Sequence, residues 1–210
     1  MKITTLLLTC LFTINLIQAQ QKAITDTGEE IILFDDGKWE YKNGTSLKET
    51  EIPINSKRFK KDDHSTFLLK SNNFNVGFWL NPRIWTFKKP TDNFESEYEL
   101  KMKDEDLYGM VISEKIEIPL ESMKSIAFEN GKSVAKDLKI VKEEYRTVNG
   151  LKVLLLQMNG TTQGIKISYY SYYFSNTNGS VQFVTYTSQN LMNSYIPEIE
   201  KLLNGLVELN

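Results

Sequence analysis

Apolar and polar positions alternate over much of residues 67–188, and this period of two predicts β-strands. The strand-like segments are Phe67–Leu69, Phe74–Leu80, Trp85–Phe87, Ser96–Met102, Leu107–Glu114, Lys139–Val148, Leu151–Met158, Gln163–Phe174 and Ser180–Ser188. Asn149-Gly150 separates two of them, and this dipeptide is the strongest short signal for a two-residue hairpin turn. The second half of the region is therefore predicted to be an antiparallel meander.

Two other segments have helical spacing instead. Residues 120–137 place Met123, Ile126, Ala127 and Val134 on one face, with Gly131 weakening the middle of the helix. Residues 191–207 carry an apolar stripe made of Leu191, Tyr195, Ile199, Leu202, Leu203 and Leu206. Both stripes need a sheet to lie on.

The alternation also indicates which strands are central. In Leu151–Met158 both sets of alternating side chains are apolar, so this strand is expected to be buried on both faces. In residues 96–103, Tyr98, Leu100 and Met102 oppose a face of charged residues, which predicts a half-exposed strand near an edge. We expect an α+β fold in which an antiparallel sheet is flanked by helices on both faces.

The order of these elements resembles the PsbP-like fold, an α/β/α sandwich. The similarity lies in Phe78–Trp85, where a strand is followed by Pro-x-x-Trp, in residues 164–174 and 179–187, and in the final helix ending at Leu202–Leu206. It covers roughly residues 67–207. The resemblance implies a fold, and since members of this group mostly act by binding partner proteins, it favours a non-catalytic role.

The chain before residue 67 is expected to have three parts. Lys2 and the apolar run Ile3–Ile17 are typical of a secretory signal peptide, residues 1–19, with cleavage after Ala19. Residues 20–41, with two Asp-x-Gly-type turns, predict a small β-meander that resembles an N-terminal element of secreted Bacteroidetes-type proteins. Residues 42–66 are polar and charged, which predicts a linker before a domain at residues 67–210.

Composition narrows the possible functions. The single cysteine, Cys10, lies within the signal peptide, so the mature chain would have no disulfide and no thiol nucleophile. The 25 basic and 27 acidic residues are mixed along the chain, which does not indicate nucleic-acid binding. No apolar stretch after Ile17 reaches membrane length, so we expect no transmembrane segment in the mature protein.

Candidate catalytic chemistry is sparse. The single histidine, His64, lies beside Asp62 and Asp63 in the expected linker, and neither a metal site nor a nucleophilic triad is predicted there. Glu143 and Glu144 point to opposite faces of a strand, so they do not form a paired acid and base. Gly131-Lys132-Ser133 lacks the upstream glycine of a phosphate loop, and no cofactor is indicated.

Residues 169–174 are unusually aromatic. Alternation puts Tyr169 and Tyr173 on one face and Tyr170, Tyr172 and Phe174 on the other. The first set is expected to be core. The second set is either an open strip that binds a glycan, peptide or lipid, or the other half of the core under a helix.

These observations lead to two hypotheses. The first is an exported, periplasmic or secreted, non-enzymatic binding or accessory module for a protein or small apolar ligand, with Tyr170, Tyr172 and Phe174 as candidate ligand-binding residues. The alternative is an envelope or extracellular hydrolase that uses carboxylates. Two acids sharing a cleft, one with a raised pKa, would favour the hydrolase, and an exposed aromatic patch without such a pair would favour binding.

Overall fold

The computed structural model describes residues 21–24, 30–34, 39–41, 51–91 and 96–209, which divide into two units, 1–51 and 52–210. The predicted signal peptide, residues 1–19, lies outside the described residues. In the first unit, β1 (Gln21–Ile24), β2 (Glu30–Leu33) and β3 (Trp39–Tyr41) pair antiparallel in the order β1-β2-β3. The predicted meander of residues 20–41 is therefore present as strands.

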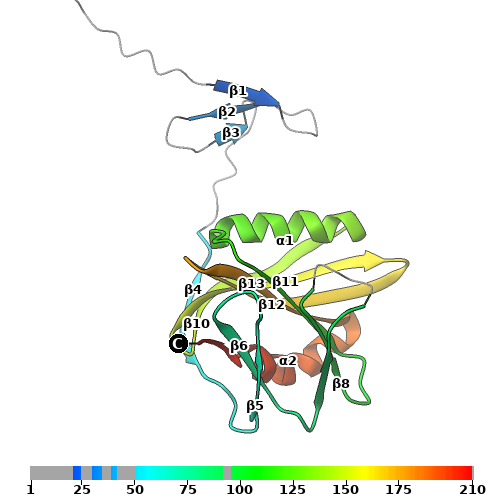
Figure 1. The fold of residues 1–210 in the computed structure, drawn as a ribbon. Helices are drawn as coiled ribbons and strands as arrows, with labels where there is room; N and C mark the ends of the chain where they lie inside the picture. Colours follow the sequence, from blue (N-terminus) through cyan, green and yellow to red (C-terminus); the bar gives the residue numbers. More distant parts are fainter. Residues whose placement is uncertain (1–20, 25–29, 35–38, 42–50, 92–95, 210) are drawn as a thin grey trace, which may run out of the picture. The chain divides into compact units, whose positions relative to one another are not determined.

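The second unit is built on an eight-stranded sheet in the order β4-β10-β11-β12-β13-β9-β8-β7 (Figure 1). The strands are β4 (Ile54–Phe59), β7 (Trp85–Lys88), β8 (Tyr98–Met102), β9 (Tyr108–Glu114), β10 (Lys139–Val148), β11 (Leu151–Thr162), β12 (Ile165–Asn176) and β13 (Gly179–Ser188). All neighbours pair antiparallel except β4, which runs parallel to β10. The central meander and the place of β8 next to an edge are as the alternation predicts.

A second, three-stranded sheet has the order β14-β6-β5 and consists of β5 (Phe67–Lys70), β6 (Val76–Leu80) and β14 (Leu206–Glu208). The chain's last strand thus pairs with β6, far away in sequence. The predicted final helix is wrong at its end, because α2 (Gln189–Leu203) stops before this strand.

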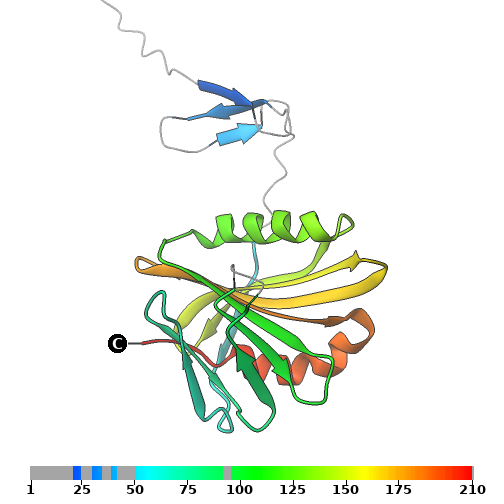
Figure 2. The same cartoon turned by 45° about the vertical axis from the view of Figure 1, so that its right-hand side comes forward.

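A hydrophobic core lies on each face of the large sheet. On one face, α1 (Leu120–Val134) buries Met123 and Ala127 against Leu154, Leu156 and Tyr173. On the other face, α2 and the small sheet cover a larger core whose members include Val153, Leu155, Phe78, Phe183 and Ile199. Figure 2 shows α1 on one side of the sheet and α2 on the other.

The expected sandwich is realised only in part, because the fold is dominated by strands. α2 shares its face with β5, β6 and β14, and α1 packs mainly on β11 and β12. The face beyond β12 therefore retains partly exposed side chains.

The linker prediction for residues 42–66 is wrong in its second half. Ile54–Phe59 form the edge strand β4, and Phe59 is buried in the larger core. The segment is polar because β4 shows most of its side chains to solvent, so its sequence has no apolar alternation. The compact unit starts at Ile52 and not at Phe67.

Candidate functional site

The candidate residues Tyr170, Tyr172 and Phe174 do not form an open strip. Their side chains are 1%, 0% and 5% exposed, and they belong to the core under α2. This arrangement corresponds to the alternative in which they are the other half of the core. The alternation identified their shared face correctly, but α2 closes it.

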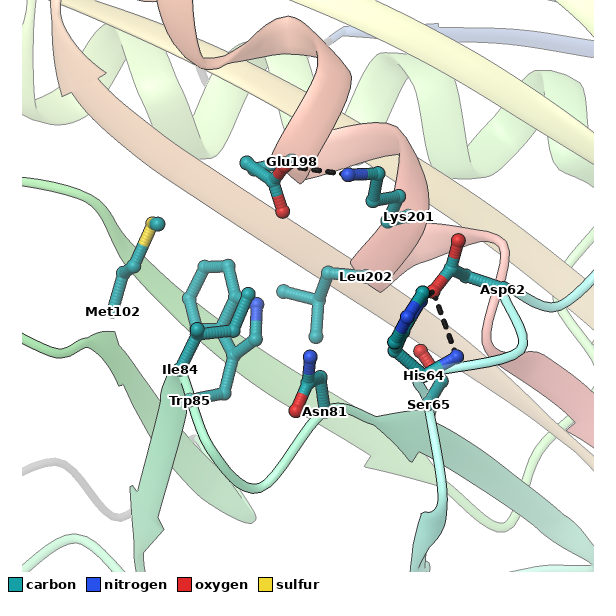
Figure 3. Close-up of a pocket in the computed structure, with 10 residues that line it drawn as sticks. All are labelled: Asp62, His64, Ser65, Asn81, Ile84, Trp85, Met102, Glu198, Lys201 and Leu202. Atoms are coloured by element: carbon teal, nitrogen blue, oxygen red, sulfur yellow. Dashed lines mark hydrogen bonds and ion pairs between the residues drawn. The ribbon is translucent and has the colours of Figure 1, made fainter.

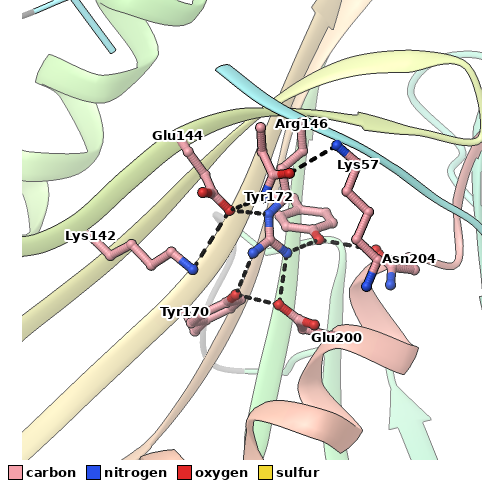
Figure 4. Close-up of polar contacts among 9 residues, drawn as sticks. Lys57, Lys142, Glu144, Arg146, Tyr170, Tyr172, Glu200 and Asn204 are labelled. Carbon is pink, nitrogen blue, oxygen red and sulfur yellow. Dashed lines mark hydrogen bonds and ion pairs between the residues drawn. The ribbon is translucent and has the colours of Figure 1, made fainter. Parts of the chain in front are cut away.

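The hydroxyls of Tyr170 and Tyr172 meet a buried guanidinium (Figure 4). Arg146, 3% exposed, donates from Nη2 to Tyr170 OH at 3.1 Å and from Nη1 to Tyr172 OH at 2.8 Å. It also donates from Nε to Glu144 Oε1 at 2.5 Å and from Nη1 to Glu200 Oε1 at 2.8 Å. The guanidinium lies 4.4 Å from the centre of the Phe59 ring. We call these residues the Arg146 cluster.

The electrostatics of the Arg146 cluster are those of a closed network. Burial raises the pKa of Glu200, but hydrogen bonds from Tyr170 and Arg146 outweigh it and hold that pKa below its usual value. Burial likewise raises the pKa of Glu144, and hydrogen bonds from Arg146 and Asn55 reverse the effect. Burial raises the pKa of Tyr172 to about 12. Both carboxylates therefore stay ionised and paired, which is the state of a structural cluster and not of a general acid.

A pocket of about 350 Å³ lies on the α2 side of the sheet (Figure 3). Trp85, Ile84, Met102 and Leu202 give it apolar walls. The remaining lining residues are polar: Asp62, His64, Ser65, Asn81, Glu198 and Lys201. The structure thus places His64 at the edge of a pocket, which the linker prediction did not anticipate.

The polar side chains around this pocket contact one another. His64 Nδ1 lies 3.2 Å from Asp62 Oδ1, and Lys201 Nζ lies 2.6 Å from Glu198 Oε1. Trp85 is only 3% exposed. Within the described ranges, no group of three or more His, Cys, Asp or Glu side chains is placed to hold a metal ion. The pocket therefore presents little accessible ring surface, and its polar lining residues are already hydrogen-bonded or ion-paired to one another where distances are short.

A group of partly exposed tyrosines lies on the opposite face of the same sheet, while the more exposed Phe67 and Phe87 pack against each other elsewhere. Tyr169 of β12 pairs with Tyr186 of β13, and Tyr186 pairs with Tyr108 of β9. The rings of Tyr108 and Tyr186 stack with centres 5.5 Å apart, and those of Tyr169 and Tyr186 are 6.1 Å apart. All three are half-buried. We call them the tyrosine row.

The tyrosine row continues into charged strands at the edge of the sheet. Tyr108 pairs with Lys101 of β8, whose Nζ lies 5.4 Å from the Tyr108 ring centre. In the adjacent register, Lys88 and Glu99 form an ion pair at 3.1 Å. A hollow of about 440 Å³ lies here, lined by Thr86, Phe87, Lys88, Glu99, Leu100, Lys101, Tyr108, Gly109 and Tyr186.

Sequence reasoning did not identify Tyr108 and Tyr186 as surface residues. Each stands in a different strand, and only the cross-strand register brings them beside Tyr169. A usable signal was present in the alternation of β8, because Glu99 and Lys101 mark the solvent-facing side of that strand. The residues of β9 and β13 that pair with this side of β8 include Tyr108 and Tyr186 of the tyrosine row.

No protein-family model and no curated protein sequence matches the chain. Among solved structures it is similar to cyanobacterial PsbP (CyanoP) from Synechocystis, with a TM-score of 0.56 and 10% identity over 70% of this chain and 94% of that one. It is also similar to a Pseudomonas aeruginosa protein of unknown function, with a TM-score of 0.44 and 11% identity over 60% and 83% of the two chains. A structure from Bacteroides thetaiotaomicron is similar with a TM-score of 0.45 and 9% identity, over 65% of this chain and 46% of that one.

The first of these similarities shows the fold. The chain has a PsbP-like fold, as the resemblance in residues 67–207 predicts. At 10% identity the similarity carries no information on ligand or activity.

Proposed function

We propose that the chain is an exported, non-enzymatic accessory module that binds a partner protein on the tyrosine row. The observation that carries the proposal is the alignment of Tyr169, Tyr186 and Tyr108 across three adjacent strands on a sheet face that α1 covers only in part. Tyrosine provides a large contact area with few rotatable bonds and a polar tip, so it is enriched at the centres of protein interfaces.

The surroundings of the tyrosine row fit a protein partner. Beside the rings lies the half-buried Met110, which pairs with the buried Val184 in the neighbouring register and adds apolar surface. The ion pair Lys88–Glu99 and the exposed Lys101 form a charged edge around this centre. An apolar aromatic centre with a polar rim is the usual anatomy of a protein–protein interface.

The carboxyl groups support binding over hydrolysis. Wherever a described carboxyl group has a clearly shifted pKa, the shift is downward: Asp62, Glu121, Asp137, Glu144 and Glu200. A carboxylate hydrolase needs one acid that keeps its proton near neutral pH. None of these five groups is suited to that role.

Export is supported by the sequence of residues 1–19, with Lys2 ahead of the apolar run Ile3–Ile17. The partner would then be a protein of the cell envelope or of the extracellular space. Neither helix of the described residues combines the length and hydropathy needed to cross a bilayer.

Photo-crosslinking tests this function in the cells that naturally express the protein. A p-benzoylphenylalanine in place of the exposed Lys101, next to Tyr108, should trap a discrete adduct that mass spectrometry identifies as one protein. The same photoreactive group in place of Lys136, an exposed residue after α1, should not trap it.

The double substitution Tyr108→Ser and Tyr186→Ser in the Lys101-labelled protein should reduce that adduct at least tenfold, because truncating interface hot spots costs about 2 kcal/mol or more each. Circular dichroism establishes that the double variant is folded. The same adduct from both labelled positions, its persistence in the folded double variant, or no adduct at all would each refute the proposal.

A further inference from the structure

A second hollow of about 520 Å³ lies beside α1, on the same face of the sheet as the tyrosine row but nearer the end of β9. Ile126 and Asn130 line it from α1, Ile112 and Glu114 from β9, and Gln182 from β13. Ser96 and Glu97, just before β8, line it together with Asn73, Ser113 and Ile118. We call it the Ser96 cavity. Its size suits a small organic molecule.

Ser96 is the residue that points to a ligand. It is 5% exposed, and its hydroxyl oxygen is buried without any hydrogen-bond partner. Leaving a buried hydroxyl unpaired is unfavourable, and most buried polar atoms in folded proteins therefore have a partner. A polar group of a molecule bound in the cavity would supply that partner.

The charges around the cavity indicate which sign of ligand charge it favours. Its described lining contains the carboxylates of Glu97 and Glu114 and no Lys, Arg or His. Glu97 accepts four hydrogen bonds, from Ser71, twice from Asn72 and from Ser113, and all of these donors are neutral. These bonds orient the carboxylate but leave its negative charge uncompensated. The field in the cavity therefore favours a cation and opposes an anion.

The rest of the lining is aliphatic. Ile112 and Ile118 are half-buried, and Ile126, on the cavity side of α1, is 40% exposed although it belongs to the apolar face of that helix. Together these isoleucines provide apolar surface next to the polar end formed by Ser96 and Glu97. A ligand that fits both the polar end and the apolar surface of the cavity has a cationic group attached to a short apolar group.

We propose that the Ser96 cavity binds a small organic amine, with the ammonium group hydrogen-bonded to Ser96 and facing the Glu97 carboxylate, and the apolar body against Ile112, Ile118 and Ile126. An ammonium group is a donor only, so it suits the free acceptor site of the Ser96 hydroxyl. This site is separate from the partner-docking surface of the tyrosine row.

Three probes of nearly the same shape and different charge test the ligand class: 2-phenylethylammonium, 2-phenylethanol and 3-phenylpropanoate. Each is titrated into the full chain, without its signal peptide, and followed by two-dimensional amide and methyl NMR. The amine should shift the resonances of Ser96, Ile112, Ile126 and Gln182, and it should bind at least tenfold more tightly than the alcohol. The carboxylate should not bind.

Two variants test the residues. Ser96→Ala removes a hydroxyl that has no partner in the fold, so it should leave the melting temperature unchanged or slightly higher and weaken amine binding about tenfold or more, the effect of a hydrogen bond to a charged group. Ser122→Ala, on an exposed position of α1, is the matched control and should bind the amine as the parent does. Glu114→Gln, at the exposed rim, should weaken the amine severalfold and reduce the salt dependence of its binding.

The Tyr108→Ser and Tyr186→Ser double variant should bind the amine normally, which separates this proposal from the docking surface. Equal binding of the amine and the carboxylate, shifts confined to residues outside the cavity, unchanged amine binding by Ser96→Ala, or no binding of the amine at all would each overturn it.

Discussion

Arg146 is a charged residue that the fold keeps at 3% exposure. An unpaired buried charge is very costly, and a buried ion pair is only tolerated when its remaining donors are also satisfied. Here the guanidinium donates four hydrogen bonds, two to carboxylates and two to tyrosine hydroxyls, and rests on the Phe59 ring. The network joins β10, β12, α2 and β4, so the residue connects elements that are distant in sequence.

Replacing Arg146 should therefore destabilise the second unit strongly. Arg146→Met keeps most of the side-chain volume but removes the buried guanidinium that pairs with Glu144 and Glu200, and we expect a loss of about 3–5 kcal/mol in the free energy of unfolding. Urea denaturation measures it. Lys142→Met is the control, since Lys142 lies 3.6 Å from Glu144 but is 42% exposed and should cost less than about 1 kcal/mol. A loss from Arg146→Met as small as the control's would contradict this account.

The same network predicts how stability depends on pH. The pKa of Glu200 is lower in the folded protein than its ordinary value of 4.5, so its contribution is fully present above pH 4.5 and is lost as the pH falls through the folded value. Unfolding free energies measured between pH 7 and pH 3 should decline on the acidic side. In Glu200→Gln the decline should be shallower, because that group no longer binds a proton on unfolding. An identical pH profile for the two proteins would be inconsistent with the lowered pKa.

Residue patterns predicted the two faces of the aromatic strand correctly but could not decide between an open strip and a second half of the core for Tyr170, Tyr172 and Phe174. Tyr170, Tyr172 and Phe174 do lie on one face, but the helix that covers them comes later in the chain, and alternation within one strand says nothing about it. Tyr169, expected to be core, packs against the edge of the α1 core and is half-buried beside Tyr186. How much of a sheet face stays exposed depends on how far the covering helix extends across the sheet. That depends on the tertiary arrangement and cannot be deduced from one strand.

At the scale of elements, strands that end in a diagnostic turn were predicted best. Asn149 and Gly150 have φ values of 49° and 90°, the left-handed conformations of a two-residue hairpin between β10 and β11. Gln163 and Gly164 form a second turn of the same kind, with φ values of 49° and 80°. The sequence prediction placed Gln163 inside a strand, because glutamine gives no turn signal of its own.

Strands without a local signal were missed. β4 is an edge strand with a polar sequence, and β14 follows α2 after only Asn204 and Gly205. Both are held by pairing with residues far away in the chain, β10 and β6 respectively. Their apolar residues are too few to produce a period of two, so only the tertiary arrangement identifies them.

Gly205 makes the connection from α2 to β14 possible. Its carbonyl accepts a hydrogen bond from Trp79 N at 2.8 Å, and a Cβ at this position would lie 1.9 Å from the Trp79 carbonyl oxygen. Gly205→Ala should therefore separate β14 from β6 and lower the free energy of unfolding by about 2–3 kcal/mol, at the upper end of overpacking effects.

Gly131→Ala is the control for Gly205→Ala. Its new Cβ would meet only the Leu138 Cδ2 atom, at 2.5 Å, and this methyl can rotate away. Alanine also favours the helix by about 1 kcal/mol, so the net loss should be small. Thermal and urea unfolding of the two variants measure the contrast, and equal losses would show that the Trp79 contact does not limit position 205.

At the scale of the whole molecule, the decisive boundary lies between Glu51 and Ile52, where the compact unit begins. The predicted domain starts fifteen residues later, at Phe67, and the segment between the two starts contains β4. Its removal would take away Phe59, which is 7% exposed, and the hydrogen bond from Asn55 to Glu144. It would also leave β10 as an open edge, which is a template for aggregation.

Two fragments test this boundary. Residues 52–210 contain every strand of the large sheet and should unfold in one cooperative urea transition. Residues 67–210 lack β4 and should lose at least about 3 kcal/mol, the typical cost of deleting one buried phenylalanine side chain. Because the Arg146 guanidinium rests on Phe59, the shorter fragment should also respond less to Arg146→Met than the longer one does. Equal stabilities would mean that β4 is dispensable and that the unit begins at Phe67, as its hydrophobic pattern predicts.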